Sequence, residues 1–431
     1  MAFLAVALCV FIVVVVMTVM TGLVQGFKDN NHKWVGDCVV GTESLVGFPY
    51  YEDFINRLEE SDYIDGVSPV VKSYALVRSR NSEESMGVEM MGIEPVEHSK
   101  VTGFGETLYH HKNDVPGAFK PAYDPNLAGF VAGIDKWLAR DQRGNYNYEA
   151  GPVEAALVVS CFPLTAKGAL AKAGTEMVNT KTFYYSDISR SGLAGVDSSF
   201  IYLPFEDAQL LCGMAGAVKR VSAIHIKFKP NVGLEDGCGK VAVMWKKFVE
   251  DKKGEKQAEL LNTVTVQNWK DYRRAFIAAM EKEQTMLAIM FAFVGITTVF
   301  IVLVVFYMIV SHKSKDIGIL KSIGVSRLDV VELFSCFAFL IGLLGSAIGA
   351  FCGWLFLLKI NSIESFLFKH FGFQLWDRTM YAIGDIPNTI DLKVLTVIIV
   401  LAISACLAGA FIPSRRAAKL EVVETLRVSQ L

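Results

Sequence analysis

Residues Thr285–Val310 read TMLAIMFAFVGITTVFIVLVVFYMIV, a run of 26 residues without a charged side chain. The hydrocarbon core of a bilayer is about 30 Å thick, and a helix of about 20 apolar residues crosses it. Three other stretches have the same character: Ala2–Val24, Leu333–Leu358 and Val394–Ile412, which we expect to end at Pro413. The sequence therefore predicts four transmembrane helices, and it excludes a soluble cytosolic enzyme.

The composition narrows the class of protein further. Of the 431 residues, 52% are hydrophobic and 20% are charged, and the formal net charge is −2. A chain without an excess of Lys and Arg is not expected to bind nucleic acid. The first two spans are separated by about 260 residues of ordinary soluble composition. We expect them to form a large α+β domain.

Basic residues in short loops determine the orientation of membrane helices. They follow the second and fourth spans, as Lys313, Lys315, Lys321 and Arg327 and as Arg415, Arg416, Lys419 and Arg427. We therefore expect these segments and the N-terminus in the cytoplasm, and the large domain outside. Lys28 and Lys33 follow the first span with no basic residue before it, which taken alone favours the opposite orientation. A cleaved signal peptide and a true start other than Met1 are alternative interpretations of this end.

The predicted order of segments follows from these spans. It is a transmembrane helix at 1–27, an extracytoplasmic domain at 28–283 with a helical stalk at 269–283, a transmembrane helix at 284–310, a cytoplasmic coupling segment at 311–329, a transmembrane helix at 330–358, an extracytoplasmic loop at 359–392, a transmembrane helix at 393–413 and a cytoplasmic tail at 414–431. Within the domain, short segments that carry Val predict strands at Val35–Val40, Val70–Val77 and Met86–Ile93. Apolar spacing predicts a helix at Tyr51–Glu60. Pro116–Gly151 is rich in turn residues and predicts a loop-rich inserted subdomain.

No catalytic or metal site is predicted. The domain has four cysteines without CxxC spacing, Cys38, Cys161, Cys212 and Cys238, which allow three pairings as disulfides or stay as buried thiols. His98, His110 and His111 are interpreted as solvated loop histidines rather than metal ligands, because adjacent strand residues point to opposite faces. The phosphate loop is also missing: Leu234 and Val241 replace its first glycine and its Ser/Thr around Gly239-Lys240. The chain is therefore expected to bind no cofactor, ATP included.

The segment after the second span has a helical pattern of its own. Ile317, Leu320 and Ile323 share one face, whereas Lys313, Lys315 and Lys321 are expected on the solvated side. Gly324 suits a helix C-cap, and Ser326 suits the N-cap of the next helix. A short amphipathic helix needs a lipid surface or a protein groove to cover its apolar face, and the pattern leaves both open.

This segment resembles the coupling segment of the FtsX/MacB-like ABC transporter permease family. The similar residues are Lys315, Asp316, Ile317, Leu320, Lys321, Ile323, Gly324 and Arg327. The tail from Pro413 to Arg427 resembles the closing motif of that family. Met91–Pro95, Asp197–Ala208, and Tyr381 with Ile386-Pro387 are most similar to lipoprotein-releasing permease subunits of the LolC/LolE type. The chain departs from the family in lacking a basic head before the first span and in carrying cysteines in the outer domain.

The resemblance implies a mechanically driven permease of the bacterial inner membrane. Its outer domain would combine a porter-like module with an inserted β-rich module. Its partners would be two copies of a separate ABC ATPase, which bind ATP and Mg²⁺, and a second permease subunit, identical or different. Closure of the ATPases would move the coupling segment, and the stalk would relay this motion to the outer domain. The cargo would be a membrane lipoprotein.

Two sets of residues in the spans carry further expectations. Small residues in the third span predict close helix packing: Gly342, Gly345, Ser346, Gly349 and Gly353. Flexible or aromatic residues near the outer ends of the first two spans suit a cavity for acyl chains: Met17, Met20, Phe27, Met286, Met290 and Phe293. The methionines can equally face lipid or one another.

Other function classes stay open on the sequence. An FtsX-like subunit signals to an extracytoplasmic hydrolase and transports nothing, and a large outer domain argues against that reading. A MacB-like efflux permease usually has its ATPase fused at the N-terminus, and this chain has none. A membrane-anchored enzyme is disfavoured because no catalytic constellation emerges.

Overall fold

The computed structural model describes residues 2–80, 83–141, 144–148, 155–171, 178–373, 376 and 385–420. Tyr381, the tail after residue 420 and parts of 116–151 lie outside the described residues. The chain forms two compact units. We call Met1–Gln25, Ala278–Trp376 and Asp385–Leu431 the helical unit, and Gly26–Ile277 with Asp377–Gly384 the sheet unit.

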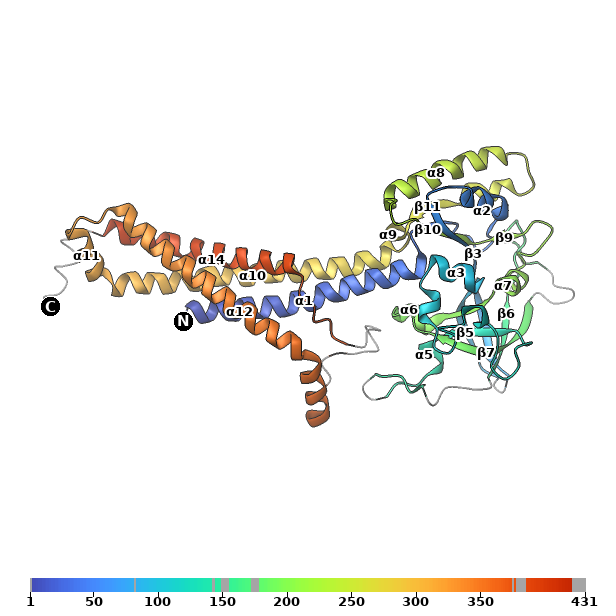
Figure 1. Cartoon of the computed structure of the whole chain (residues 1–431), viewed down its shortest axis with the longest axis horizontal. Coiled ribbons are helices and arrows are strands. Elements are labelled where there is room, and N and C mark those ends of the chain that lie inside the picture. Colours follow the sequence, from blue (N-terminus) through green and yellow to red (C-terminus); the bar gives the residue numbers. More distant parts are fainter. Residues whose placement is uncertain are drawn as a thin grey trace. The chain divides into compact units, whose positions relative to one another are not determined.

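Four long helices form the described part of the helical unit, and they confirm the predicted spans (Figure 1). They are α1 (Ala2–Val35), α10 (Arg274–His312), α12 (Arg327–Phe371) and α14 (Leu392–Lys419), each long and apolar enough to cross a membrane. The short helix α11 (Ser314–Ser322) connects α10 to α12. Helix α1 ends in the sheet unit, and helix α10 begins there. Each of these two helices therefore belongs partly to both units.

The helices extend past the predicted ends of the spans. Helix α12 continues beyond residue 358 to Phe371 and ends at Gly372, whose φ of 66° forms a left-handed cap. Helix α14 does not end at Pro413, which lies in its interior. The proline removes one backbone donor, and such prolines are tolerated where neighbouring groups satisfy the backbone. The Ser414 hydroxyl donates to the Ala410 carbonyl (2.5 Å) in this turn.

Glycines of α12 allow the helices to pack closely. An added Cβ at Gly345 would meet the Val6 side chain at 3.0 Å, and one at Gly353 would meet Val14 at 3.1 Å. Gly349 lies against Ala7 and Val10 in the same way, so three glycines one turn apart contact α1. On the neighbouring side, Gly342 faces Ile403 and Cys406 of α14, and Ser346 is buried with its hydroxyl bonded to the Leu343 carbonyl (3.0 Å). Helix α12 thereby holds α1 and α14.

The sheet unit is built on one large sheet. In its described part, nine strands have the order β11-β1-β10-β3-β4-β8-β5-β7-β6, and β6 also pairs with β3. The strands are β1 (Cys38–Gly41), β3 (Ile64–Ser79), β4 (Ser85–Ile93), β5 (Gly129–Gly133), β6 (Ala156–Cys161), β7 (Asn179–Ser189), β8 (Phe200–Pro204), β10 (Ala223–Phe228) and β11 (Thr265–Asn268). The long strand β3 pairs with β10 in its first half and with β4 and β6 in its second half. The pairings β3-β4-β8-β5-β7-β6-β3 therefore close a ring.

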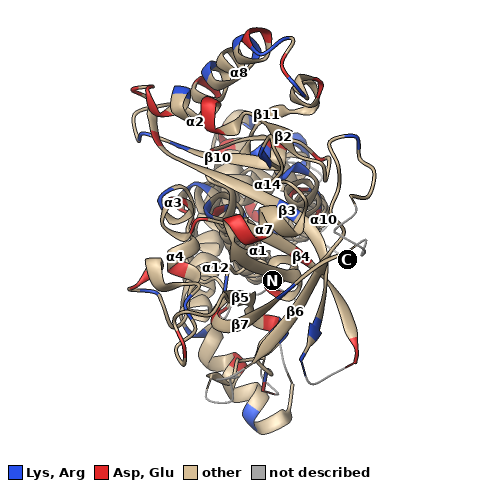
Figure 2. Cartoon of the chain, turned by 90° about the vertical axis from the view of Figure 1, so that its right-hand side faces the viewer, with Lys and Arg blue, Asp and Glu red and all other residues tan. Residues whose placement is uncertain are grey.

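Helices connect and cover these strands. They are α2 (Tyr51–Glu59), α3 (Pro95–Val101), α4 (Phe104–Thr107), α5 (Ile134–Trp137), α6 (Ala194–Ser199), α7 (Phe205–Leu211), α8 (Leu234–Asp251) and α9 (Trp269–Tyr272). Two strands, β2 (Phe48–Pro49) and β9 (Arg220–Val221), pair separately, and 3-10 turns occupy Val115–Gly117 and Ala258–Thr263. Helices α2 and α8 meet through aromatic rings, with the Phe54 and Trp245 centroids 4.7 Å apart. The outer surface of α8 carries charges of both signs (Figure 2).

Two segments of the sheet unit differ from the expectation. Pro116–Gly151 is loop-rich in most of its described residues, as predicted, but it also contributes the buried strand β5 to the large sheet and the helix α5 after it. The glycines that suggested a loop are needed in β5, because a Cβ at Gly133 would overlap the Asp197 backbone. The predicted stalk at 269–283 is interrupted: α9 ends at Tyr272 and α10 begins at Arg274.

Candidate functional site

An apolar groove opens in the helical unit between α1, α10 and α14. It has a volume of about 640 Å³. We define the apolar groove by its lining residues, Val6, Cys9, Val10, Val13, Met17, Ala288, Phe291, Ala292, Gly295, Ile296, Thr298, Val299, Lys393, Val394, Val397, Ile398, Leu401, Ala402 and Ala405. The volume falls in the range of small-molecule sites. Hydrocarbon that enters the groove from water gains about 0.8 kcal/mol per CH₂ group.

The chemistry of the groove is set by which residues each helix contributes. Small residues of α10 occur at Ala288, Ala292 and Gly295, and they leave space where larger side chains would fill it. Gly295 has no atom within 4 Å of an added Cβ. Lys393 at the start of α14 is the only charged residue among the described lining residues. The groove therefore suits an apolar chain with a polar or anionic end at Lys393.

The six residues predicted to form a cargo cavity do not lie together in the structure. Met17 lines the groove, whereas Met20 is half-buried and is not among its lining residues. Met286, Met290 and Phe293 also do not line it, and their side chains are exposed. Phe27 belongs to the sheet unit and packs against its core. The sequence prediction relied on flexible and aromatic residues, so it did not find the groove. The small residues of α10 at Ala288, Ala292 and Gly295 are nevertheless visible in the sequence.

Helix α11 has one buried and one exposed apolar edge. Ile317 is buried within the chain, whereas Ile323 is 78% exposed and Leu320 is 44% exposed. Leu320 lines a second cavity, of about 360 Å³, together with Leu333 and Phe337 of α12. The predicted face of Ile317, Leu320 and Ile323 is therefore divided between packing inside the chain and a free surface.

The polar residues of segment 311–329 also differ in their roles. Lys321 is not on the solvated side: its ammonium donates to the carbonyls of Ala418 (2.9 Å) and Leu420 (2.6 Å). A cation there satisfies carbonyl groups at the end of α14. The side chains of Lys313 and Asp316 form an exposed ion pair (2.9 Å), and Lys315 and Arg327 are exposed.

The helix caps in segment 311–329 are as predicted. Gly324 adopts a φ of 107°, a left-handed conformation that favours glycine after a helix. Ser326 accepts from the Asp329 backbone, and Asp329 accepts from the Ser326 backbone (2.9 Å), which makes a capping box at the start of α12. Both ends of the link between α11 and α12 are thus fixed by local hydrogen bonds.

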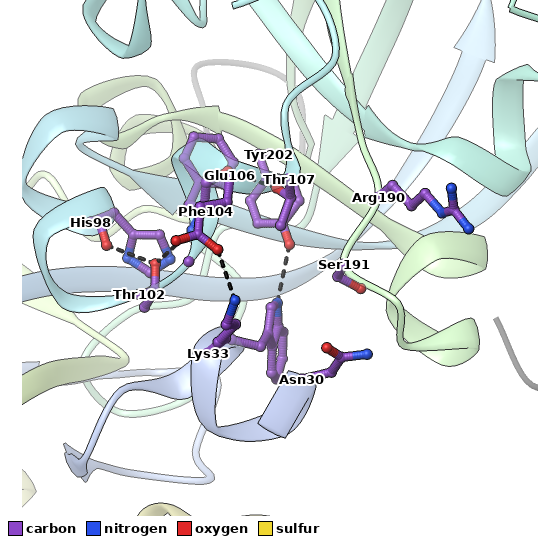
Figure 3. A pocket seen from close by; sticks show the side chains of 12 residues that line it. Asn30, Lys33, His98, Thr102, Phe104, Glu106, Thr107, Arg190, Ser191 and Tyr202 are labelled. Atoms are coloured by element: carbon purple, nitrogen blue, oxygen red, sulfur yellow. Dashed lines mark hydrogen bonds and ion pairs between the residues drawn. The ribbon is translucent and has the colours of Figure 1, made fainter. Parts of the chain in front are cut away.

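In the sheet unit, a polar pocket of about 140 Å³ surrounds the last turns of α1 (Figure 3). Lys33 pairs with Glu106 (2.8 Å), and the Trp34 indole donates to the Tyr202 hydroxyl (3.0 Å). Asn30 donates to the Gly192 carbonyl (3.1 Å). Because these polar groups bond one another, the pocket fastens the end of α1 to the strands and loops of the sheet unit.

A half-buried lysine and two buried histidines form a cluster next to this pocket. Lys72 donates to the Tyr272 hydroxyl (2.6 Å) and lies 5.1 Å from the centre of the Trp34 ring. The rings of His98 and His225 are 5.7 Å apart, and both residues are buried. His98 is therefore not the solvated loop histidine that was predicted, because it lies on α3, whose inner side faces the sheet. His110 is exposed as expected, while His111 is half-buried and contacts Asp187 (3.2 Å).

The described residues contain no group of three or more His, Cys, Asp or Glu side chains arranged to hold a metal ion. The buried carboxylate of Asp187 instead accepts backbone hydrogen bonds from Tyr109, His110 and His111. Such bonds compensate a buried charge and hold a loop.

Comparison with known proteins places these features in context. Residues 288–422 match the FtsX-like permease C-terminal family. Over 380 residues the chain is 25% identical to the lipoprotein-releasing system transmembrane protein LolC of Neisseria meningitidis serogroup B, covering 87% of this chain and 81% of that protein. Over 426 residues it is 22% identical to the protein of the same name from Xylella fastidiosa, covering 98% and 92%.

Solved structures of outer domains are also similar to part of this chain. The periplasmic region of MacB from Actinobacillus actinomycetemcomitans has 12% identity and a TM-score of 0.31, covering 57% of this chain and 95% of that structure. The extracellular domain of the noncanonic ABC-type transporter YknZ from Gram-positive bacteria has 13% identity and a TM-score of 0.27, covering 54% and 98%.

Proposed function

We propose that this chain, an ABC transporter permease with an FtsX-like domain at residues 288–422, releases lipoproteins from the bacterial inner membrane. The observation that carries the proposal is the similarity, over 81–92% of their length, to proteins named for lipoprotein release. The similarity spans both units of the chain, so it includes the groove, the coupling segment and the sheet unit.

The apolar groove is the proposed site for the acyl chains of the cargo. With the N-terminus in the cytoplasm, Met17, Ala288 and Lys393 lie toward the outer side of the membrane. A lipid-anchored protein in the outer leaflet then enters the groove sideways, with its acyl chains along the small-residue stripe of α10. Lys393 lies where the polar linkage of the anchor follows the apolar chains. The groove supports this step because its apolar lining can replace lipid tails around the acyl chains, and its small residues leave room for them.

Energy enters through helix α11. The ATP and Mg²⁺ sites belong to two copies of a partner ATPase, which contact Ile323 and the neighbouring exposed residues. Closure of the ATPases moves α11 and, through the Lys321 bonds to the Ala418 and Leu420 carbonyls, the end of α14. Helix α14 lines the groove, so a shift at its cytoplasmic end changes the shape of the cargo site. A second permease subunit completes the complex.

Helices α1 and α10 provide the path to the outer domain. Both line the groove and both continue into the sheet unit. The polar pocket around Asn30, Lys33 and Trp34 fixes the end of α1 to that unit. Motion of α1 in the membrane then reaches the sheet unit along this helix.

The proposal is tested by photo-crosslinking in the assembled transporter. A photoreactive side chain at Ala292, inside the groove, is compared with one at Val304, which lies on the same helix and is 61% exposed. We expect a lipoprotein adduct at position 292 and only lipid adducts at 304. Equal lipoprotein adducts at both positions, or none at 292 in an active transporter, would contradict the proposal.

A further inference from the structure

Two cysteines of the sheet unit lie side by side although they are distant in sequence. Cys161 ends strand β6 and Cys212 follows helix α7, 51 residues later, and their sulfur atoms are 3.7 Å apart. Both residues are buried, at 1% and 3% exposure. A disulfide has a sulfur–sulfur distance of about 2.05 Å, so small side-chain rotations bring the two atoms to bonding distance.

The backbone around this pair is held in register. Leu164 donates to the Cys212 carbonyl (3.1 Å), and Arg220 donates to the carbonyls of both Leu164 (2.8 Å) and Gly213 (2.7 Å). The two chain segments that carry the cysteines are therefore fixed beside each other. A chance encounter of two mobile thiols would show no such bonds.

The other two cysteines of the unit do not compete for this pairing. Cys38 of β1 forms a hydrogen bond with Cys238 of α8, which together with burial raises the pKa of the Cys38 thiol. Of the three pairings that the sequence leaves open, the structure brings together Cys161 with Cys212 and Cys38 with Cys238.

We propose that Cys161 and Cys212 form a disulfide bond in the mature protein. The inference rests on the proposed function, because that function places the sheet unit outside the cytoplasm, where disulfides persist. The bond joins the end of β6 to the end of α7.

The oxidant is a protein disulfide of a thiol–disulfide oxidoreductase. The Cys161 thiolate attacks one sulfur of that disulfide, and the other sulfur leaves as a thiolate. Cys212 loses its proton to water and attacks the Cys161 sulfur of the mixed disulfide, which releases the oxidant as a dithiol. Two electrons pass to the oxidant in total. Because both sulfurs are buried after folding, the reaction accompanies folding.

The test analyses full-length protein from membranes that are denatured in the presence of N-ethylmaleimide, so that buried free thiols are also blocked. Digestion without reductant, followed by mass spectrometry, is expected to yield a peptide pair linked through Cys161 and Cys212. In a Cys161→Ala variant, Cys212 should instead carry the maleimide. Both cysteines carrying the maleimide in the wild type would overturn the disulfide.

A second measurement separates this outcome from a failure of the proposed function. A Lys246→Cys variant, exposed on α8, is treated in the same cells with a membrane-impermeant maleimide. If position 246 is labelled and both Cys161 and Cys212 carry N-ethylmaleimide, the disulfide is rejected, whereas the extracytoplasmic location of the sheet unit is supported. Absence of labelling at 246 would reject the location, while the mass spectrum still decides the bond.

The bond should also appear in the stability of the purified protein. Closing a loop of this length is expected to raise the melting temperature by about 5–10 °C. Unfolding and refolding in dithiothreitol should lower the melting temperature of the wild type by that amount. A double variant, Cys161→Ala with Cys212→Ala, should not respond to the reductant. An equal response of both proteins would contradict the assignment.

Discussion

His98 and His225 are buried beside Lys72 in the sheet unit, so both imidazoles are neutral in the folded protein. Burial, with a smaller contribution from Lys72, lowers the pKa of His98 to about 3. Burial, Lys72 and His98 together lower the pKa of His225 well below its ordinary value. An unfolded histidine titrates near 6.5. Below that pH the unfolded chain binds protons that the folded chain does not, and the free energy of unfolding falls.

We predict that the stability of the sheet unit decreases between pH 7 and pH 5, by up to about 1.4 kcal/mol per pH unit for each of these histidines. His225→Leu should remove one such contribution and flatten the profile. Asp197 acts in the opposite direction, because burial raises its pKa to about 6. It is present in both proteins, so the difference between them isolates His225. Denaturant unfolding at several pH values measures this, and parallel profiles would refute the prediction.

Gly349 is the tightest of the glycine contacts with α1, since an added Cβ would overlap the Ala7 carbonyl oxygen and lie 2.9 Å from the Val10 Cβ. Overpacking of this kind costs about 1–3 kcal/mol. We expect Gly349→Ala to lower the thermal stability of the detergent-purified protein. Gly295→Ala is the matched control, because its Cβ meets nothing within 4 Å. A similar loss in both variants would mean that α1 and α12 do not pack here.

Sequence reasoning at the scale of single residues succeeded where a side chain acts locally. Gly324 and Ser326 form caps, and caps depend on residues within one turn. It failed for Lys321 and His98, whose partners lie about 97 and 30 positions away. Helical periodicity gives the side of a helix on which a residue lies, but it does not show what packs there.

Among the elements, helix α11 is the one whose surface bears most directly on energy coupling. Ile323 is 78% exposed, so its side chain stabilises nothing inside the chain. If a partner ATPase covers it, a carboxylate at this position is buried without a partner and costs a few kcal/mol, and about 1.4 kcal/mol already weakens binding tenfold.

We therefore predict that Ile323→Asp reduces recovery of the ATPase in a pull-down at least tenfold while expression is unchanged. Ser322→Asp adds the same charge at an adjacent exposed residue that is already polar, and it should reduce recovery much less. Leu320 is a poorer choice for this test because it also lines the cavity against α12. Equal recovery with Ile323→Asp and wild type would place α11 on lipid rather than on a partner.

Some helices and strands of this membrane protein can be predicted from its sequence, and others cannot. The four spans are predictable because apolar length is a property of each helix alone. Strand β5 was missed because glycines are its first and last residues and because its burial depends on β7 and β8, which are distant in sequence. The groove was missed for the same reason: it exists only where α1, α10 and α14 come together.

At the scale of the whole molecule, the proposed function requires one orientation of the chain in the membrane. A Ser311→Cys variant, at the cytoplasmic end of α10, should resist an impermeant maleimide added outside. Lys253→Cys, exposed in the sheet unit, should react. The opposite pattern would place α11 outside, where no ATPase can reach it. The groove would then open toward the wrong leaflet, and the coupling model would fail with the topology.

The central claim is that this chain uses ATP hydrolysis in a partner to lift a lipoprotein out of a bilayer. The direct measurement reconstitutes the chain, its companion permease and the ATPase in liposomes with a labelled lipoprotein. An apolar acceptor must be present in solution, because each CH₂ group of an anchor costs about 0.8 kcal/mol in water. We predict that the labelled lipoprotein appears in the soluble fraction when ATP is present. It should stay in the liposomes with a non-hydrolysable ATP analogue or with the Ile323→Asp variant. Label that stays in the liposomes while the assembled complex hydrolyses ATP would contradict it.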